Sequence, residues 1–120
     1  MNFVLVGKGS WGSKLYLNLK KIGNVIKIIR SKNNYKDIDL KNIDWIIIAS
    51  PNNLHYQHVK FFLEKKINVF CEKPLTTSYD LTKKLIKVSK KNKTKLYIDD
   101  IEIFKTKKIV PKKKNYICWD

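Results

Sequence analysis

The feature that most constrains the fold is a glycine triplet, Gly7, Gly9 and Gly12, spaced Gly-x-Gly-x-x-Gly directly after an apolar run at residues 2–6. A short, uninterrupted apolar run is typical of a strand buried on both faces of a parallel sheet. After the glycines, apolar side chains recur at helical spacing through residues 11–22. The chain is therefore expected to begin as a strand, a tight turn and a helix, in that order.

Strand and helix patterns alternate along the rest of the chain. The sequence predicts strands at residues 2–6, 25–29, 44–49, 68–71 and 95–98, and helices at residues 11–22, 55–65 and from Thr77 or Ser78 to about 91. A cluster of turn-forming residues at 50–53 is expected to follow the third strand as a breaker. Strands joined by helices of this length need parallel pairing with right-handed crossovers. The predicted fold class is therefore α/β, a doubly wound parallel sheet in a single domain.

We expect this sheet to have five to six strands. Residues 1–100 carry the regular alternation, whereas residues 101–120 contain two lysine runs around Pro111 and a possible sixth, edge-like strand at 115–119. We interpret residues 1–100 as one domain and residues 101–120 as a C-terminal extension or the start of a further domain. The lysine runs are interpreted as solvated loop rather than as a binding surface.

Composition narrows the possible partners. The formal net charge is +16, but Arg30 is the only arginine among 26 basic residues, and the lysines are spread along the whole chain. A nucleic-acid module would show clustered arginines with stacking aromatics, so we expect no specific nucleic-acid binding, only weak attraction at low salt. No apolar run approaches the roughly 18 to 20 residues of a membrane span, and no basic leader precedes the first strand. These features predict a cytoplasmic protein that does not bind membranes.

Metal and disulfide chemistry are not expected. His55 and His58 lie three residues apart, but no further Cys or acidic residue stands at ligand spacing, so we predict no metal site. Cys71 and Cys118 lie in separate apolar stretches, and we interpret both as reduced core thiols.

The glycine triplet has a chemical meaning in this context. A first glycine permits the tight turn, a second lets the backbone approach a pyrophosphate, and a third lets the helix pack closely on the strand. We therefore predict a dinucleotide-binding loop formed by Gly7, Gly9, Ser10, Trp11 and Gly12. The Trp11 and Trp45 rings are interpreted as packing groups rather than cofactor-stacking groups. A glycine turn without a ligand is the alternative.

The end of the second strand indicates which dinucleotide is preferred. In NAD-specific domains an acidic residue stands at this point and binds the ribose 2′-hydroxyl. Here the sequence reads Arg30-Ser31-Lys32, so no carboxylate is available, while the Arg30 guanidinium and the Ser31 hydroxyl suit a 2′-phosphate. We therefore favour NADP over NAD.

Three motifs together resemble one enzyme family. The segments are Gly7-Lys8-Gly9-Ser10-Trp11-Gly12, Ala49-Ser50-Pro51-Asn52-Asn53-Leu54-His55 and Cys71-Glu72-Lys73-Pro74-Leu75, each at a predicted strand end. In this order they resemble the Gfo/Idh/MocA oxidoreductases, named for glucose-fructose oxidoreductase and inositol dehydrogenase. The resemblance covers about residues 1–100, the cofactor-binding half of that family.

The resemblance implies cofactor contacts from two further segments. The first segment follows the third strand: it contacts the adenosine side through Ser50, Pro51, Asn52 and Asn53, and its His55 lies near the nicotinamide half. The second segment follows the fourth strand and consists of Glu72, Lys73 and Pro74. The resemblance also implies that Lys73 is catalytic, because the lysine of this motif reaches the nicotinamide ribose and the substrate hydroxyl, where an ammonium orients the reactants.

Family members continue into a second domain that binds substrate and supplies an aspartate and a histidine for proton transfer. The 120 residues stop before such a domain, and Trp119-Asp120 is at most its opening. The resemblance implies an oxidoreductase for a sugar, sugar nucleotide or cyclitol once that domain is supplied, and it leaves homo-oligomerisation possible. We expect the chain alone to bind the dinucleotide without efficient turnover. A non-catalytic nucleotide-sensing or partner-binding module is the alternative.

Overall fold

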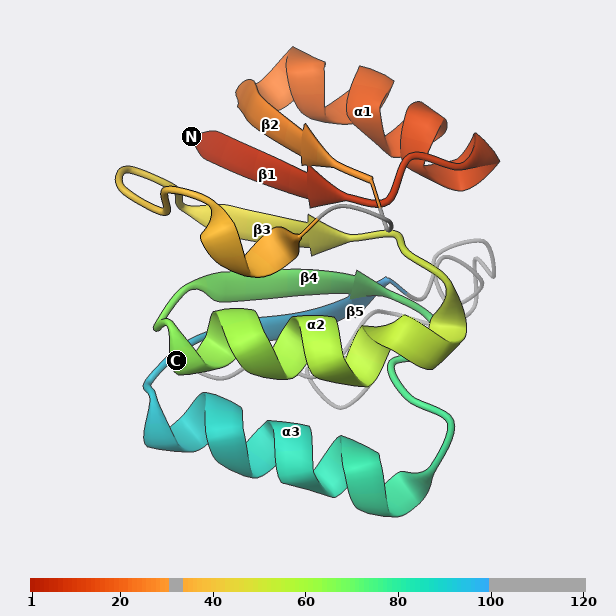
Figure 1. The fold of residues 1–120 in the computed structure, drawn as a ribbon, viewed down its shortest axis with the longest axis vertical. Coiled ribbons are helices and arrows are strands. Elements are labelled where there is room, and N and C mark those ends of the chain that lie inside the picture. Colours follow the sequence, from red (N-terminus) through yellow and green to blue (C-terminus); the bar gives the residue numbers. More distant parts are fainter. Residues whose placement is uncertain (31–33, 100–120) are drawn as a thin grey trace, which may run out of the picture.

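The structure, a computed structural model, describes residues 1–30 and 34–99 (Figure 1). Five strands form one sheet in the order β2-β1-β3-β4-β5, and every neighbouring pair is parallel. The strands are β1 (Asn2–Val6), β2 (Asn24–Ile29), β3 (Trp45–Ile48), β4 (Asn68–Glu72) and β5 (Leu96–Asp99). This arrangement confirms the predicted α/β class with a doubly wound parallel sheet. The sixth strand predicted at 115–119 lies outside the described residues.

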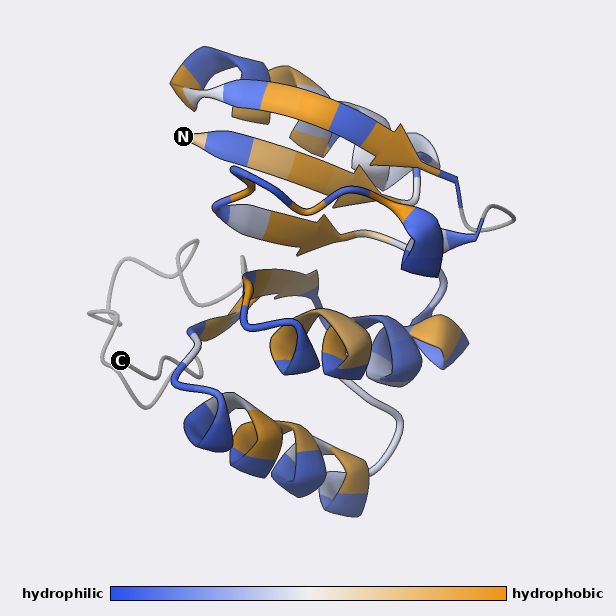
Figure 2. Ribbon diagram, turned by 60° about the vertical axis from the view of Figure 1, so that its left-hand side comes forward, coloured by the Kyte–Doolittle hydropathy of each residue, from blue (hydrophilic) through white to orange (hydrophobic). Residues whose placement is uncertain are grey.

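Three helices cover the sheet unevenly. Helix α1 (Ser10–Ile22) lies on one face, and helices α2 (Asn52–Glu64) and α3 (Tyr79–Lys91) lie side by side on the other (Figure 1). Apolar residues concentrate in the strands and on the sides of the helices that turn toward the sheet (Figure 2). This is the pattern expected where a parallel sheet is buried between helical layers.

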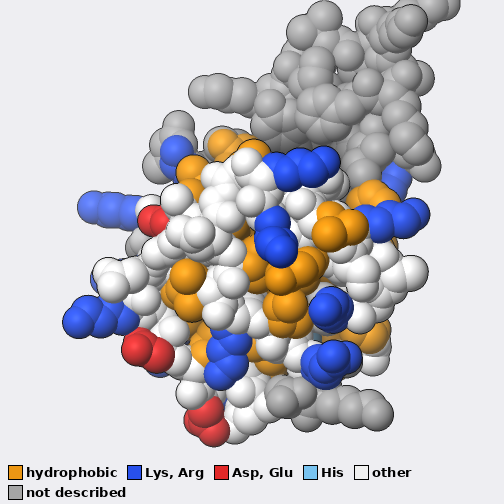
Figure 3. Space-filling view, turned by 90° about the horizontal axis from the view of Figure 1, so that it is seen from above, with side chains coloured by type: hydrophobic (Ala, Val, Ile, Leu, Met, Phe, Trp, Pro, Cys, Tyr) orange, Lys and Arg blue, Asp and Glu red, His pale blue; other side chains and the backbone are white. Residues whose placement is uncertain are grey.

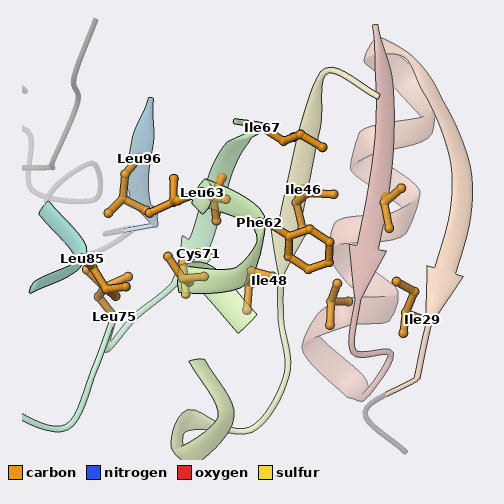
Figure 4. Packing of buried hydrophobic residues seen from close by; sticks show 14 residues of the cluster. Ile29, Ile46, Ile48, Phe62, Leu63, Ile67, Cys71, Leu75, Leu85 and Leu96 are labelled. Atoms are coloured by element: carbon orange, nitrogen blue, oxygen red, sulfur yellow. The ribbon is translucent and has the colours of Figure 1, made fainter. Parts of the chain in front are cut away.

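Alternation along β1 divides the core into two layers. Successive side chains of a strand point to opposite faces, so Leu5 packs with Leu19 of α1, whereas Val4 and Val6 pack in the layer that contains Phe62 of α2. All of these side chains except Leu19 are at most 1% exposed. Figure 4 shows the larger layer, in which Phe62 lies between side chains of β3 and β1.

Among the described residues, α1 covers only part of its face of the sheet. Side chains of β3, β4 and β5, among them Trp45, Phe70 and Tyr97, line an apolar groove of about 480 Å³ together with residues of β1 and α1. The Trp45 and Tyr97 rings lie 5.4 Å apart between centroids. Trp45 is therefore half-buried against the sheet, in agreement with its interpretation as a packing aromatic.

Two local predictions differ from the structure. Helix α2 begins at Asn52, three residues earlier than predicted, so the expected breaker at 50–53 was wrong for Asn52 and Asn53. Pro51 has φ −56°, a value that leads directly into a helix, and a proline at a helix start loses no needed N–H. The short 3₁₀ helix η1 (Tyr35–Asp37) was not predicted from the sequence; there the Asn34 side chain accepts a hydrogen bond from the Lys36 amide.

Basic side chains are spread over one face of the molecule. Figure 3 shows lysine and arginine side chains spread over the face that α1 and β2 form, with apolar side chains between them. Among the residues described, no helix combines the length and the apolar character needed to cross a bilayer. Cys71 is a buried free thiol, and burial raises its pKa well above the usual range, so it is unreactive; Cys118 lies outside the described residues.

Candidate functional site

A cleft of about 510 Å³ opens where the carboxyl ends of β1, β2 and β3 meet. The direction in which successive strands are added to the sheet reverses at this point, because β2 lies on one side of β1 and β3 lies on the other. Ligands of doubly wound sheets bind at such a switch point. The cleft is lined by Gly7, Lys8, Gly9, Ser10, Trp11, Gly12, Arg30, Ala49, Ser50 and Pro51.

Gly7 and Gly12 are required by the fold itself. Gly7 has φ +93°, and its N–H donates to the Ile29 carbonyl over 2.7 Å. A methyl group on Gly7 would lie 2.6 Å from the Ala49 carbonyl oxygen, and one on Gly12 would collide with the carbonyl oxygen of Gly7. The two glycines therefore let the loop turn sharply while α1 packs against the end of β1.

Gly9 is different, because nothing in the fold requires a glycine there. Its φ is −82°, and a methyl group would meet nothing within 4 Å. Gly9 is also the N-cap of α1 and offers no side chain to accept hydrogen bonds from the first-turn amides, which include that of Ser10. The open space above Gly9 and the uncapped helix end suit a bound anion that approaches the backbone closely.

Trp11 lies in the first turn of α1 and forms part of the cleft wall. Its Nε1 is buried and has no hydrogen-bond partner in the described part of the chain. The Lys14 ammonium lies 5.9 Å from the centroid of the ring. Trp11 is thus a half-buried packing residue that carries one unsatisfied donor beside the glycine loop.

The cleft carries positive charge only. Lys8 and Arg30 are both exposed at its rim, and no acidic residue is among those that line it. Lys8 was missed by the sequence prediction, although its place between two loop glycines was a usable signal. Its Nζ lies 5.1 Å from the centroid of the Tyr16 ring. A cleft with this charge favours an anionic ligand.

The other predicted site residues lie next to the cleft or beneath it. Asn52 and Asn53 are exposed in the first turn of α2 and do not line the cleft. Glu72 ends β4, and Lys73 and Pro74 are exposed in the following turn, where the Lys73-Pro74 peptide is cis. Because β3 and β4 are neighbours, this turn lies at the same sheet edge as the cleft. Ser31 lies outside the described residues.

His55 is placed below the cleft rather than in its wall. The side chain is fully buried, with Nδ1 2.7 Å from the Pro74 carbonyl oxygen and Nε2 2.7 Å from the Ser50 carbonyl oxygen. The Ser50 hydroxyl in turn lies 2.9 Å from Nδ1 of His58. Sequence reasoning placed His55 near the cofactor and did not foresee this buried network.

His58 is a neutral packing group near pH 7. Burial, and to a smaller extent the charge of His55, lowers its pKa from 6.5 to about 4. Its ring meets the Tyr35 ring edge to face, with centroids 4.5 Å apart. The histidine pair forms hydrogen-bonding contacts within the core. Within the described ranges no group of three or more metal-ligating side chains occurs.

Comparison with known proteins identifies relatives of this chain. Residues 25–99 match the model of the GFO_IDH_MocA oxidoreductase family, NAD-binding Rossmann fold. The uncharacterized oxidoreductase YgjR of Escherichia coli strain K12 is 42% identical over 64 residues, which are 53% of this chain and 18% of that protein. The chain thus spans less than a fifth of this curated relative's length in the match.

Solved structures share the fold. A probable dehydrogenase from Thermotoga maritima superposes with a TM-score of 0.74 at 24% identity, over 82% of this chain and 35% of that chain. The WlbA (WbpB) dehydrogenase from Thermus thermophilus, in complex with NAD and UDP-GlcNAcA, superposes with a TM-score of 0.72 at 21% identity, over 82% of this chain and 41% of that chain. The common part is therefore about a third of one solved structure and about two fifths of the other.

Proposed function

The chain belongs to the Gfo/Idh/MocA oxidoreductase family as an NAD-binding Rossmann domain, and from this premise we propose that its glycine-loop cleft holds NADP. The pyrophosphate would lie over Gly9, at the N-terminus of α1. There the first-turn amides lack a side-chain cap, a ligand can approach the backbone, and the helix dipole favours negative charge. Gly7 and Gly12 shape the loop, and Ser50 and Pro51 form the opposite wall.

The preference for NADP rests on Arg30. This residue directly follows β2 and lines the cleft, at the point where NAD-specific domains carry a carboxylate. A guanidinium can bind a 2′-phosphate with two parallel hydrogen bonds, and Lys8 adds a second positive charge at the same rim. Ser31 is proposed to assist through its hydroxyl.

Titration with NADPH and NADH tests this preference. A hydrogen bond to a charged group contributes about 1.5–3 kcal/mol, so we expect Arg30→Ala to raise the Kd for NADPH roughly 10-fold to 100-fold and to change that for NADH little. Lys27→Ala is the matched control, since it removes one positive charge from the exposed face of β2, away from the cleft. If wild type binds neither dinucleotide, the proposed function fails; if Arg30→Ala weakens both equally, the NADP preference fails.

The nicotinamide half is proposed to extend toward the turn after β4. Lys73 is exposed in this turn, one strand beyond the cleft, and Glu72 and Pro74 flank it. When bound, the cofactor supplies hydride exchange at nicotinamide C4. The Lys73 ammonium would bind the nicotinamide ribose and orient a substrate hydroxyl or keto oxygen, acting as a catalytic residue through its fixed charge. Asn52 and Asn53 would contact the adenosine side from the start of α2.

The substrate is proposed to be a sugar, sugar nucleotide or cyclitol. The fold neighbour from Thermus thermophilus, whose structure holds NAD together with a UDP-linked sugar acid, supports this class. This chain corresponds to about a third to two fifths of the solved relatives, so a substrate domain would complete the site and provide a surface for homo-oligomerisation. On its own the 120-residue chain is expected to bind dinucleotide without efficient turnover, and robust dehydrogenase activity of the purified chain would contradict this.

A further inference from the structure

His55 connects two turns that the chain separates by more than twenty residues. It lies in the first turn of α2, is fully buried, and presents a different ring nitrogen to each turn. Nδ1 faces the carbonyl oxygen of Pro74 after β4, and Nε2 faces the carbonyl oxygen of Ser50 after β3, both at 2.7 Å. Carbonyl oxygens only accept hydrogen bonds, so each ring nitrogen must carry a proton to bond to its carbonyl, and both contacts are hydrogen bonds at once only when the ring is the imidazolium.

The two turns would contact different parts of the dinucleotide in the proposed site. Ser50 and Pro51 line the cleft that would hold the pyrophosphate. Pro74 directly follows Lys73, which would serve the nicotinamide half. His55 contacts the backbone of both turns, through the carbonyl oxygens of Ser50 and Pro74.

Ser50 is itself anchored from below. Its hydroxyl lies 2.9 Å from Nδ1 of His58, and the His58 ring packs against Tyr35 of η1. His58 is 1% exposed. Because Ser50 is held by this second buried histidine, the contact between His55 and Ser50 fixes His55, and the opposite nitrogen then fixes Pro74.

We propose that His55 is a positioning residue: it ties the Lys73-Pro74 turn to the floor of the cleft and thereby sets where the Lys73 ammonium stands relative to a bound dinucleotide. The proposal rests on the proposed function, because it assigns His55 a role in that same site. It differs from a ligand role, since a fully buried ring with both nitrogens engaged does not touch the cofactor.

Two substitutions separate the two ends of the ring. The side-chain amide nitrogen of Asn stands close to the position of Nδ1, and that of Gln close to the position of Nε2. His55→Asn therefore keeps a donor toward Pro74, whereas His55→Gln keeps one toward Ser50 and releases the turn that carries Lys73. Lys73→Met supplies the reference, because it removes the ammonium and leaves the ring in place.

Affinity for two probes is measured by calorimetry on the 120-residue chain. The first pair is NADPH, which contains the nicotinamide ribose, and 2′-phosphoadenosine 5′-diphosphate, which keeps the adenosine half and the pyrophosphate but lacks that ribose. NADH and ADP form a second pair, with the same difference between a complete and a shortened dinucleotide. We expect His55→Gln and Lys73→Met each to raise the Kd for NADPH roughly 10-fold and to leave the shorter probe within about 2-fold. His55→Asn should recover most of the affinity.

Coupling between the two residues is the decisive result. If His55 acts through Lys73, the double variant His55→Gln with Lys73→Met binds NADPH no more weakly than either single variant. Additive losses, an equal loss for the shorter probe, or an Asn variant as weak as the Gln variant would overturn the proposal. If wild type binds neither pair of probes, the failure belongs to the proposed function instead.

Thermal unfolding followed by circular dichroism shows whether each variant is folded. If His55→Gln does not fold, the binding measurements are made on His55→Asn instead, because this variant retains the contact with Pro74. Lys73→Met made in the Asn background must then still raise the Kd for NADPH roughly 10-fold. A background in which Lys73→Met has no effect would contradict the proposal.

Discussion

The glycines of the loop after β1 differ in what a side chain would meet. At Gly7 a methyl group would press on the backbone of Ala49 and Ser50, and the residue has a positive φ. At Gly9 the same methyl group would extend into open space. At the scale of single residues, the loop therefore contains glycines that the fold requires and one glycine, Gly9, that it does not.

This difference predicts opposite outcomes for two alanine variants. Gly9→Ala should cost less than about 1 kcal/mol of stability, since its backbone conformation is open to any residue, while NADPH affinity should fall roughly 10-fold or more because the methyl group occupies the pyrophosphate position. Gly7→Ala should lose at least about 1–3 kcal/mol from backbone strain alone. Urea unfolding and dinucleotide titration measure the two effects. Unchanged affinity in a folded Gly9→Ala variant would argue against the proposed pyrophosphate position.

His58 predicts a pH dependence of stability. Its pKa is about 4 in the folded chain, below the ordinary 6.5 of a histidine, so the unfolded chain binds more protons between these two values. Stability is fully present above about pH 6.5 and falls as the pH drops toward 4, by up to about 2 kcal/mol between pH 7 and pH 5. Urea unfolding at both pH values should show this loss in wild type and a smaller one in His58→Gln. Equal losses in the two proteins would contradict the assignment.

At the scale of elements, helix boundaries depend on single side chains. The sequence predicted that α3 starts at either Thr77 or Ser78. In the structure Ser78 is the N-cap, and its Oγ accepts a hydrogen bond from the Leu81 amide over 3.2 Å. Thr76 supports the same turn through its contact with Thr82 over 2.7 Å. The acidic Asp80 in the first turn and lysines in the last turn agree with the helix dipole.

A pair of variants tests the cap of α3. Removing an N-cap side chain leaves a first-turn amide without its partner, so Ser78→Ala should destabilise the domain by about 1 kcal/mol. Thr77→Ala is the matched control, an exposed neighbour outside the cap, and it should stay within about 0.5 kcal/mol of wild type. Urea unfolding measures the stability of both variants. A larger loss of stability in Thr77→Ala than in Ser78→Ala would place the N-cap one residue earlier.

At the scale of the whole molecule, charge acts in two ways. The net charge of +16 attracts any polyanion, and the lysines are spread over an exposed surface. The proposed cofactor contact, in contrast, depends on a defined cleft with two basic residues at its rim. Interactions of exposed charges are screened over about 10 Å at 0.1 M salt, whereas hydrogen bonds formed inside a cleft are screened less.

Salt should therefore separate the two kinds of binding. We expect the affinity for a single-stranded oligonucleotide to fall by roughly 100-fold or more between 50 and 200 mM salt, because it depends on counterion release. The affinity for NADPH should fall by less than about 10-fold over the same range, since few phosphates are involved. Fluorescence anisotropy and calorimetry measure the two series. Oligonucleotide binding that persists at 200 mM salt would favour a nucleic-acid function over the proposed one.

The sequence by itself determined the strand and helix order, the parallel sheet and the place of the glycine loop. These follow from local patterns: apolar runs for buried strands, helical spacing of apolar residues, and glycines where a strand meets a helix. The early start of α2 was missed because Pro51 and the asparagines after it also suit a turn. Trp45 and Cys71 were correctly interpreted as packing residues, because apolar neighbours in sequence also surround them in space.

Only the tertiary structure decided which of the predicted site residues face a common space. It placed Arg30 beside the glycine loop, since β1 and β2 end at the same edge of the sheet, and it added Lys8 to the rim. It also buried His55 beneath the cleft with its two nitrogens on separate turns. Such contacts join residues far apart in the chain, and their geometry depends on packing and strand register, which local sequence patterns do not encode.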